Sequence, residues 1–104
     1  MHIHFERSGG FMGTRIEATI NTEDLPPEEA QKVTSLIEEA SFFDLPSAIA
    51  SPTPGADQFQ YRVTVESEER KHTVEIGDAA IPEDVQPLLR QLTILARGKG
   101  PSSG

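Results

Sequence analysis

The side chains best suited to chemistry in this sequence are three histidines. His2 and His4 lie two residues apart in a stretch that alternates polar with apolar residues, so both should point to one face of a strand. Glu6, or His72 from a distant strand, could supply a third ligand for a zinc ion. His72, however, occupies an apolar position of its own strand and should face the opposite side of the sheet. We therefore expect no metal site and no cofactor.

Adjacent carboxylates occur at Glu28–Glu29, Glu38–Glu39 and Glu68–Glu69. Neighbours in a helix do not face each other, so these pairs are unsuited to acid–base catalysis. Serine, histidine and aspartate are present, but in no arrangement typical of a nucleophile and its base. We expect no catalytic residues and no enzyme activity. A metal-binding or ligand-binding enzyme is the third alternative, behind two kinds of protein-binding module.

A glycine-rich turn presents a different possibility, because its glycines surround two large apolar residues. Glycine favours tight turns, and turns lie at the surface. Phe11 or Met12 either begins the second strand and covers the edge of the core, or projects towards a protein partner. Both residue types are enriched in the cores of interfaces. The candidate partner-binding residues of this turn are Ser8, Gly9, Gly10, Phe11, Met12 and Gly13.

Length and charge restrict the class of protein. The 104 residues suffice for one core, so we expect a single domain over residues 1–98 and a flexible tail over residues 99–104. The net charge of −8 repels phosphate groups, which argues against nucleic-acid and membrane partners. The N-terminus does not resemble a signal peptide, and cysteine is absent. We therefore expect a cytoplasmic protein.

Alternating apolar residues predict four strands, within residues 1–6, 15–21, 59–66 and 72–76. Helical spacing predicts one helix after each pair of strands. The first should be capped by Asp24 and end near Phe42 or Phe43. Residues 78–82 should lead into the second, with Gly98 at the position just after it. The order ββαββα predicts an α+β fold, a four-stranded antiparallel sheet with two helices packed on one face. The strand order stays open.

The expected core draws on both helices and on the second pair of strands. Phe59 and Tyr61 are expected to be core aromatic residues, and one of Phe42 and Phe43 should be buried. The aliphatic residues that we expect to be buried are Leu36, Ile37, Val63, Val74, Leu88 and Leu92.

Several blocks of the sequence resemble the emfourin-like family. The resemblance runs from Met1 to about Ala96 and rests on the order and spacing of the blocks. These blocks are RSGGFMG at 7–13, FFDLP at 42–46, ADQFQYRVTV at 56–65, HTV at 72–74 and IPEDVQPLL at 81–89. The resemblance implies a small bacterial cytoplasmic inhibitor of protealysin-like metallopeptidases, which are relatives of thermolysin. No short motif of the family defines its contact residues.

This resemblance suggests a use for the glycine-rich turn. A thermolysin-like cleft prefers bulky apolar side chains beside its zinc, so Phe11 and Met12 could enter it and block it reversibly. The loop Ala48–Asp57 could form a second contact, because prolines stiffen a loop and reduce the entropy lost on binding. Its candidate residues are Pro52, Pro54 and Gly55. We expect the free protein to be a monomer. The alternative function is a regulatory module that binds another protein without inhibiting it.

Overall fold

A five-stranded sheet forms the frame of the protein. The computed structural model describes residues 1–9, 14–49 and 59–98. The strands are β1 (His2–Gly9), β2 (Thr14–Asn21), β3 (Ala48–Ile49), β4 (Phe59–Glu66) and β5 (Lys71–Gly77). The helices are α1 (Pro27–Glu39) and α2 (Gln86–Gly98), and short 3-10 turns are η1 (Thr22–Asp24), η2 (Phe42–Asp44) and η3 (Asp78–Ala80).

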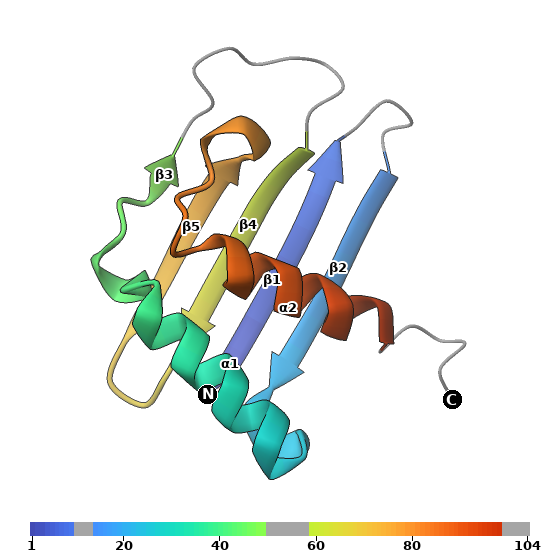
Figure 1. Cartoon of the computed structure of the whole chain (residues 1–104), viewed down its shortest axis with the longest axis vertical. Helices are drawn as coiled ribbons and strands as arrows, with labels where there is room; N and C mark the ends of the chain where they lie inside the picture. Colours follow the sequence, from blue (N-terminus) through green and yellow to red (C-terminus); the bar gives the residue numbers. More distant parts are fainter. Residues whose placement is uncertain (10–13, 50–58, 99–104) are drawn as a thin grey trace.

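The strands follow the order β2-β1-β4-β5-β3 across the sheet, as Figure 1 shows. The four longer strands pair antiparallel, whereas β3 runs parallel to β5, with Ala48 opposite Glu75 and Ile49 opposite Ile76. The α+β class and the two helices are confirmed, but the prediction of four antiparallel strands is wrong. The sequence predicts a loop at residues 48–49, because a strand of two residues is too short to show alternation.

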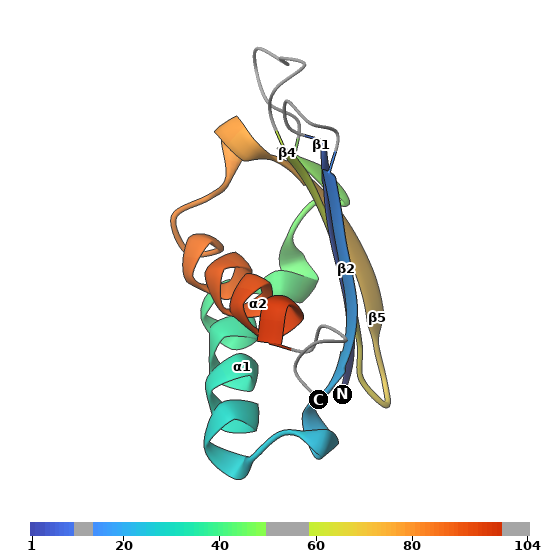
Figure 2. The same cartoon turned by 90° about the vertical axis from the view of Figure 1, so that its right-hand side faces the viewer.

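Both helices cover the same face of the sheet, and the other face is open (Figure 2). The buried side chains of the sheet, among them Ile3, Phe5 and Val63, point towards the helices and meet Leu88 and Leu92 of α2. The predicted burial is confirmed for Ile37, Val63, Val74, Leu88 and Leu92. Leu36 is only partly buried, because Val33 and Ile37 of α1, with Ala40 just after it, form the innermost row and Leu36 lies beside that row.

The aromatic core differs from the prediction. The fully buried aromatic side chains are Phe5 and Phe42, with Phe43 partly buried beside Phe42 as expected. Tyr61 is partly buried and its ring centroid lies 6.2 Å from that of Phe5. Phe59 is partly exposed at the first position of β4, where the helices no longer cover the sheet fully.

The boundaries of α1 also differ from the prediction. Asp24 lies in η1 and does not cap α1, which follows Pro26 and has no side-chain cap. The helix ends at Glu39, before Phe42 and Phe43, since Ser41 adopts a left-handed conformation with φ of 49°.

The second helix begins at Gln86, so Pro87 lies in its first turn, where a missing N–H group leaves no helical bond unmade. Gly98 is the last residue of the helix, whereas the sequence predicts that it follows the helix. Each of the two helices has 13 residues, and no helix in the described part of the chain is long and apolar enough to span a membrane.

Candidate functional site

The two segments selected from the sequence both begin and end at one end of the sheet. Gly9 is paired with Thr14 on one side and with Phe59 on the other. Residues 10–13 connect Gly9 to Thr14, and residues 50–58 connect Ile49 to Phe59. Ile49 lies opposite Ile76 near the end of β5, so all these strand ends share one side of the molecule (Figure 1). We call the surface formed by Gly9, Thr14, Ile49 and Phe59 the loop end.

Two of the predicted contact residues can be placed. Ser8 is partly buried and lies between Arg15 of β2 and Gln60 of β4. Gly9 has φ of 101°, a value that glycine adopts without steric cost, so the glycine is required where β1 ends. The other predicted contact residues lie outside the described part of the chain: Gly10, Phe11, Met12, Gly13, Pro52, Pro54 and Gly55.

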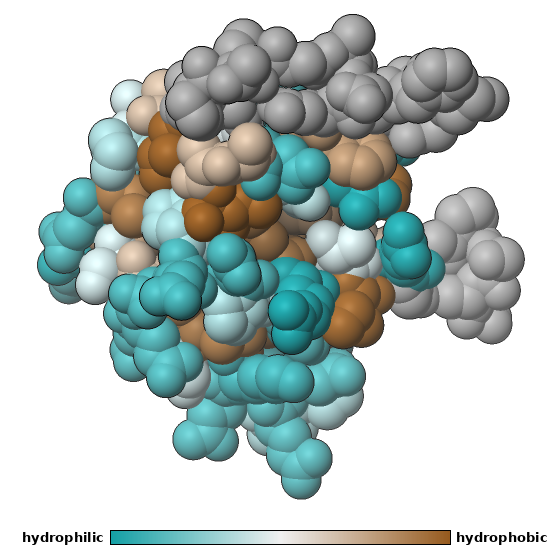
Figure 3. Space-filling view, turned by 45° about the horizontal axis from the view of Figure 1, so that its top comes forward, coloured by the Kyte–Doolittle hydropathy of each residue, from teal (hydrophilic) through white to brown (hydrophobic). Residues whose placement is uncertain are grey.

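A cation–π contact supports the loop end. The guanidinium carbon of Arg7 lies 4.5 Å from the centroid of the Phe59 ring. Arg7 lies opposite Ile16 of β2 and Tyr61 of β4 in the register. Both of these side chains are partly buried and pack against the core. Figure 3, in which this end comes forward, shows hydrophobic side chains gathered in the middle of the view and hydrophilic ones below them. At the loop end itself, the paired backbone carries two partly buried apolar side chains, Ile49 and Phe59.

A cluster of charged residues occupies the open face of the sheet. Arg15 donates to Glu6 at 2.8 Å and to Glu17 at 3.1 Å, while His4 Nε2 lies 3.2 Å from the Glu17 carboxylate. The hydrogen bond from Arg15 holds the pKa of Glu6 below its usual value, and the same contact raises the pKa of Arg15. Sequence reasoning grouped His4 with Glu6 but missed Glu17, which the register places directly opposite Glu6.

The histidines do not converge on a single site, as the sequence predicts. His72 faces the helices, where its ring lies edge-on to Phe42 with centroids 5.6 Å apart. Its Nε2 lies 2.7 Å from the carbonyl oxygen of Leu45, to which it donates. His2 and His4 lie on the polar side of β1. His72 therefore has a structural role in attaching the segment after α1 to β5.

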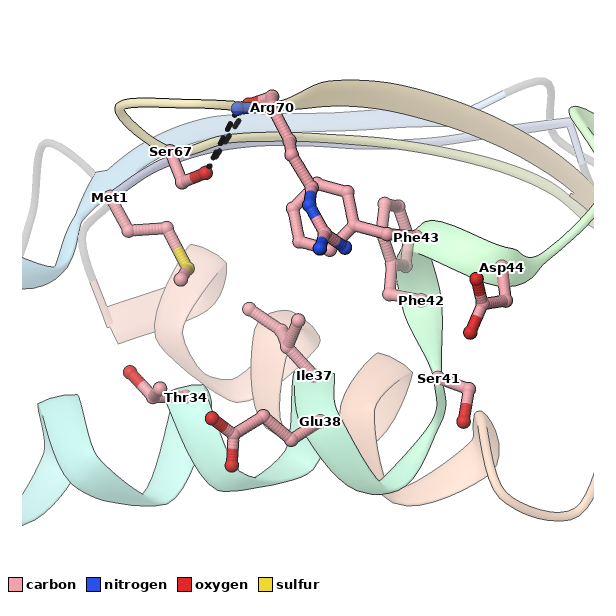
Figure 4. A pocket seen from close by; sticks show the side chains of 10 residues that line it. All are labelled: Met1, Thr34, Ile37, Glu38, Ser41, Phe42, Phe43, Asp44, Ser67 and Arg70. Carbon is pink, nitrogen blue, oxygen red and sulfur yellow. Dashed lines mark hydrogen bonds between the residues drawn. The ribbon is translucent and has the colours of Figure 1, made fainter.

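The opposite end of the sheet, which we call the turn end, holds a pocket of about 360 Å³ (Figure 4). The guanidinium of Arg70 lies beside the Phe43 ring, with its central carbon 5.4 Å from the ring centroid. The pocket could accept a small apolar group, but its polar side chains form no catalytic arrangement. Sequence reasoning missed it because the lining comes from separate segments: Met1, Thr34, Ile37, Glu38, Ser41, Phe42, Phe43, Asp44, Ser67 and Arg70.

Comparison with known proteins decides the family. The sequence model of the Emfourin family matches residues 5–93. The chain belongs to the emfourin family. The match extends from β1 into α2 and so spans both segments of the loop end. Emfourins are inhibitor proteins, and the chain is not an enzyme.

One solved emfourin structure is similar to this chain. It is emfourin from Serratia proteamaculans, described as an M4 family peptidase inhibitor, with 20% sequence identity, 86% of each chain covered and a TM-score of 0.48. No curated protein matches the sequence. The assignment to the emfourin family therefore rests on the family match over residues 5–93.

Proposed function

We propose that this emfourin reversibly inhibits a thermolysin-like zinc metallopeptidase of the M4 family by covering the active-site cleft. The observation that carries the proposal is the family match over residues 5–93. The emfourin of Serratia proteamaculans is described as an inhibitor of this peptidase family. The match begins within β1 and ends within α2, so it includes nearly all of the described fold.

We further propose that the loop end contacts the peptidase. The ladders that join β1 to β2 and to β4 continue to Gly9, so the backbone that bears residues 10–13 is fixed on both sides. Such a platform reduces the conformational entropy that binding would otherwise cost. In this proposal Phe11 and Met12 enter the cleft, and the segment with Pro52, Pro54 and Gly55 adds a second contact. Loops held by a rigid scaffold commonly carry binding residues.

A titration of peptidase activity tests the inhibition. The chain is added in steps to a fixed amount of thermolysin, and cleavage of a small peptide substrate is followed; other M4 peptidases are tested in the same way. We expect activity to fall until the inhibitor equals the enzyme and to return on dilution. A serine peptidase is the control and should keep its activity. If M4 peptidases bind the chain yet stay fully active, the regulatory module is the correct function.

The same titration is repeated in the presence of a small excess of zinc ion over the chain. Inhibition by coverage should persist, because the chain would still occupy the cleft. Inhibition that zinc abolishes would mean that the chain removes metal from the peptidase. That outcome would contradict the proposal.

A further inference from the structure

The charged cluster on the open face of the sheet has the arrangement of a metal site. We propose that His4, Glu6 and Glu17 bind one divalent transition-metal ion, with Zn²⁺ as the best match to an imidazole and two carboxylates. Water would complete the coordination. The site lies on the face away from the helices, and none of its three ligands belongs to the loop end, where we propose the peptidase contact.

The distances between ligand atoms fit zinc. Tetrahedral coordination with bonds of about 2.0–2.2 Å places ligand atoms about 3.3–3.6 Å apart. His4 Nε2 lies 3.2 Å from Glu17 Oε2 and 4.0 Å from Glu6 Oε2. One ligand atom from each of the three residues lies within 4.8 Å of the other two. Small rotations of the glutamate side chains therefore suffice to enclose the ion.

The backbone holds the three ligands on one face. His4 and Glu6 alternate along β1, and Glu17 of β2 is directly opposite Glu6. All three lie within paired strands, away from the strand ends. Ligands on regular elements are held more accurately than ligands on loops.

A neighbouring hydroxyl group orients the histidine. Thr19 is opposite His4 in the register, and its Oγ1 lies 3.3 Å from His4 Nδ1. When Nδ1 donates to this oxygen, the lone pair of Nε2 is directed towards the two carboxylates. Metal-binding histidines commonly have such a partner on their second nitrogen.

The two glutamates need a cation between them. Like charges directly opposite each other in neighbouring strands are destabilising. Arg15 supplies a positive charge at 2.8 Å from Glu6 and 3.1 Å from Glu17. Because the Arg15 side chain is 59% exposed, it can move into solvent when a metal ion takes its place. Arg15 and the metal should therefore compete for the same carboxylates.

This competition provides a specific test. Zinc ion is titrated into the whole chain in a calorimeter, and we expect one ion per chain. Glu17→Gln and His4→Gln should each weaken binding at least tenfold. Arg15→Gln should strengthen zinc binding severalfold, because the competing guanidinium is gone. Only a small change in this variant would indicate non-specific binding to an acidic surface and would contradict the proposal. Binding of zinc alone is measured, so the result does not depend on peptidase inhibition.

His2→Gln is the matched control. His2 lies on the same strand and face as His4, next to the N-terminal amine, but outside the cluster. The control should bind zinc as the wild type does. Absence of binding at millimolar zinc, or binding that Glu17→Gln leaves intact, overturns the proposal. Binding lost only in His2→Gln places the ion at the N-terminus and also overturns it. Thermal unfolding of each variant confirms that these surface substitutions leave the fold intact.

Discussion

The two ends of the sheet differ in how their strands are connected. At the turn end, the connection from β4 to β5 closes tightly, with Ser67 N–H donating to the Arg70 carbonyl at 2.7 Å. Thr22 N–H donates to the carbonyl of Met1 at 3.0 Å and fixes the start of β1 beside η1. At the loop end, the connections are residues 10–13 and 50–58, which leave from Gly9 and Ile49.

From this difference we infer that the turn end and the core provide stability, whereas the loop end provides recognition of the partner. The turn end and the core hold the sheet together through short turns and buried side chains. In the proposed function, recognition belongs to the segments that leave from the loop end, residues 10–13 and 50–58. Substitutions in the core and at the turn end should lower stability, whereas substitutions in the loop-end segments should weaken inhibition.

The largest expected effect is the loss of stability on substitution of a core residue. Leu88 of α2 is fully buried, so Leu88→Ala should lower the free energy of unfolding by about 2–5 kcal/mol. Ile94→Ala on the same helix is the control, because Ile94 is 56% exposed and should cost about 0.5 kcal/mol or less. Urea denaturation measures both. Equal effects of the two substitutions would mean that α2 is not packed on the sheet as described.

A smaller effect is expected at the turn end. Phe43 is partly buried against Phe42, with ring centroids 5.9 Å apart, and it also contacts Arg70. Phe43→Ala should lower the free energy of unfolding by about 1–3 kcal/mol, since its ring is not fully buried. The inhibition constant of the folded variant should not change. Weaker inhibition without unfolding would place the turn end in the contact and break the distinction between the two ends.

The prolines of the second segment should have a weaker effect still. Replacing Pro52 and Pro54 together by alanine should weaken inhibition by about 1 kcal/mol, since proline restricts the unbound chain. The inhibition constant is compared with that of the wild type, and the urea midpoint should shift little. An unchanged inhibition constant would restrict the contact to residues 10–13.

The smallest predicted effect is on the stability of the fold at acid pH. Arg15 holds the pKa of Glu6 below its usual value. The pair therefore contributes stability above the pKa that Glu6 has in the unfolded chain, and this contribution disappears as pH falls through the lower folded value. Glu6→Gln should reduce the loss of stability between neutral and acid pH by a small amount, because Arg15 is largely solvated. In the Arg15→Gln background, Glu6→Gln should have a smaller effect, because Arg15 is the largest cause of the lowered pKa. An effect of unchanged size would show that Arg15 is not the cause.

The sequence predicted the layers of the fold well, because alternation and helical spacing report directly which side chains face the core. It could not predict β3, whose two residues are too few for a pattern, or the end of α1 at Glu39, which depends on the left-handed conformation of Ser41. The alternation of β4 predicts a buried Phe59, but the strand continues past the point where the helices cover the sheet, and Phe59 is partly exposed there.

The sites were harder to predict than the layers. The glycine pattern selected Ser8 and Gly9 as candidate contact residues; Gly9 does adopt a glycine conformation, and the contact itself stays a prediction. That both selected segments begin and end at one end of the sheet depends on the pairing of β1 with β4 and of β3 with β5, which no local pattern contains. Glu17 was missed for the same reason, since only the strand register places it opposite Glu6.

The most direct test of the account compares inhibition and stability in a variant with Phe11→Ala and Met12→Ala, using Phe43→Ala as the matched control. The double variant should inhibit an M4 peptidase more weakly by at least about 1 kcal/mol, with an unchanged free energy of unfolding. Phe43→Ala should show the reverse. A stably folded double variant that inhibits as strongly as the wild type would contradict the account. So would a loss of inhibition that only follows a loss of folded protein.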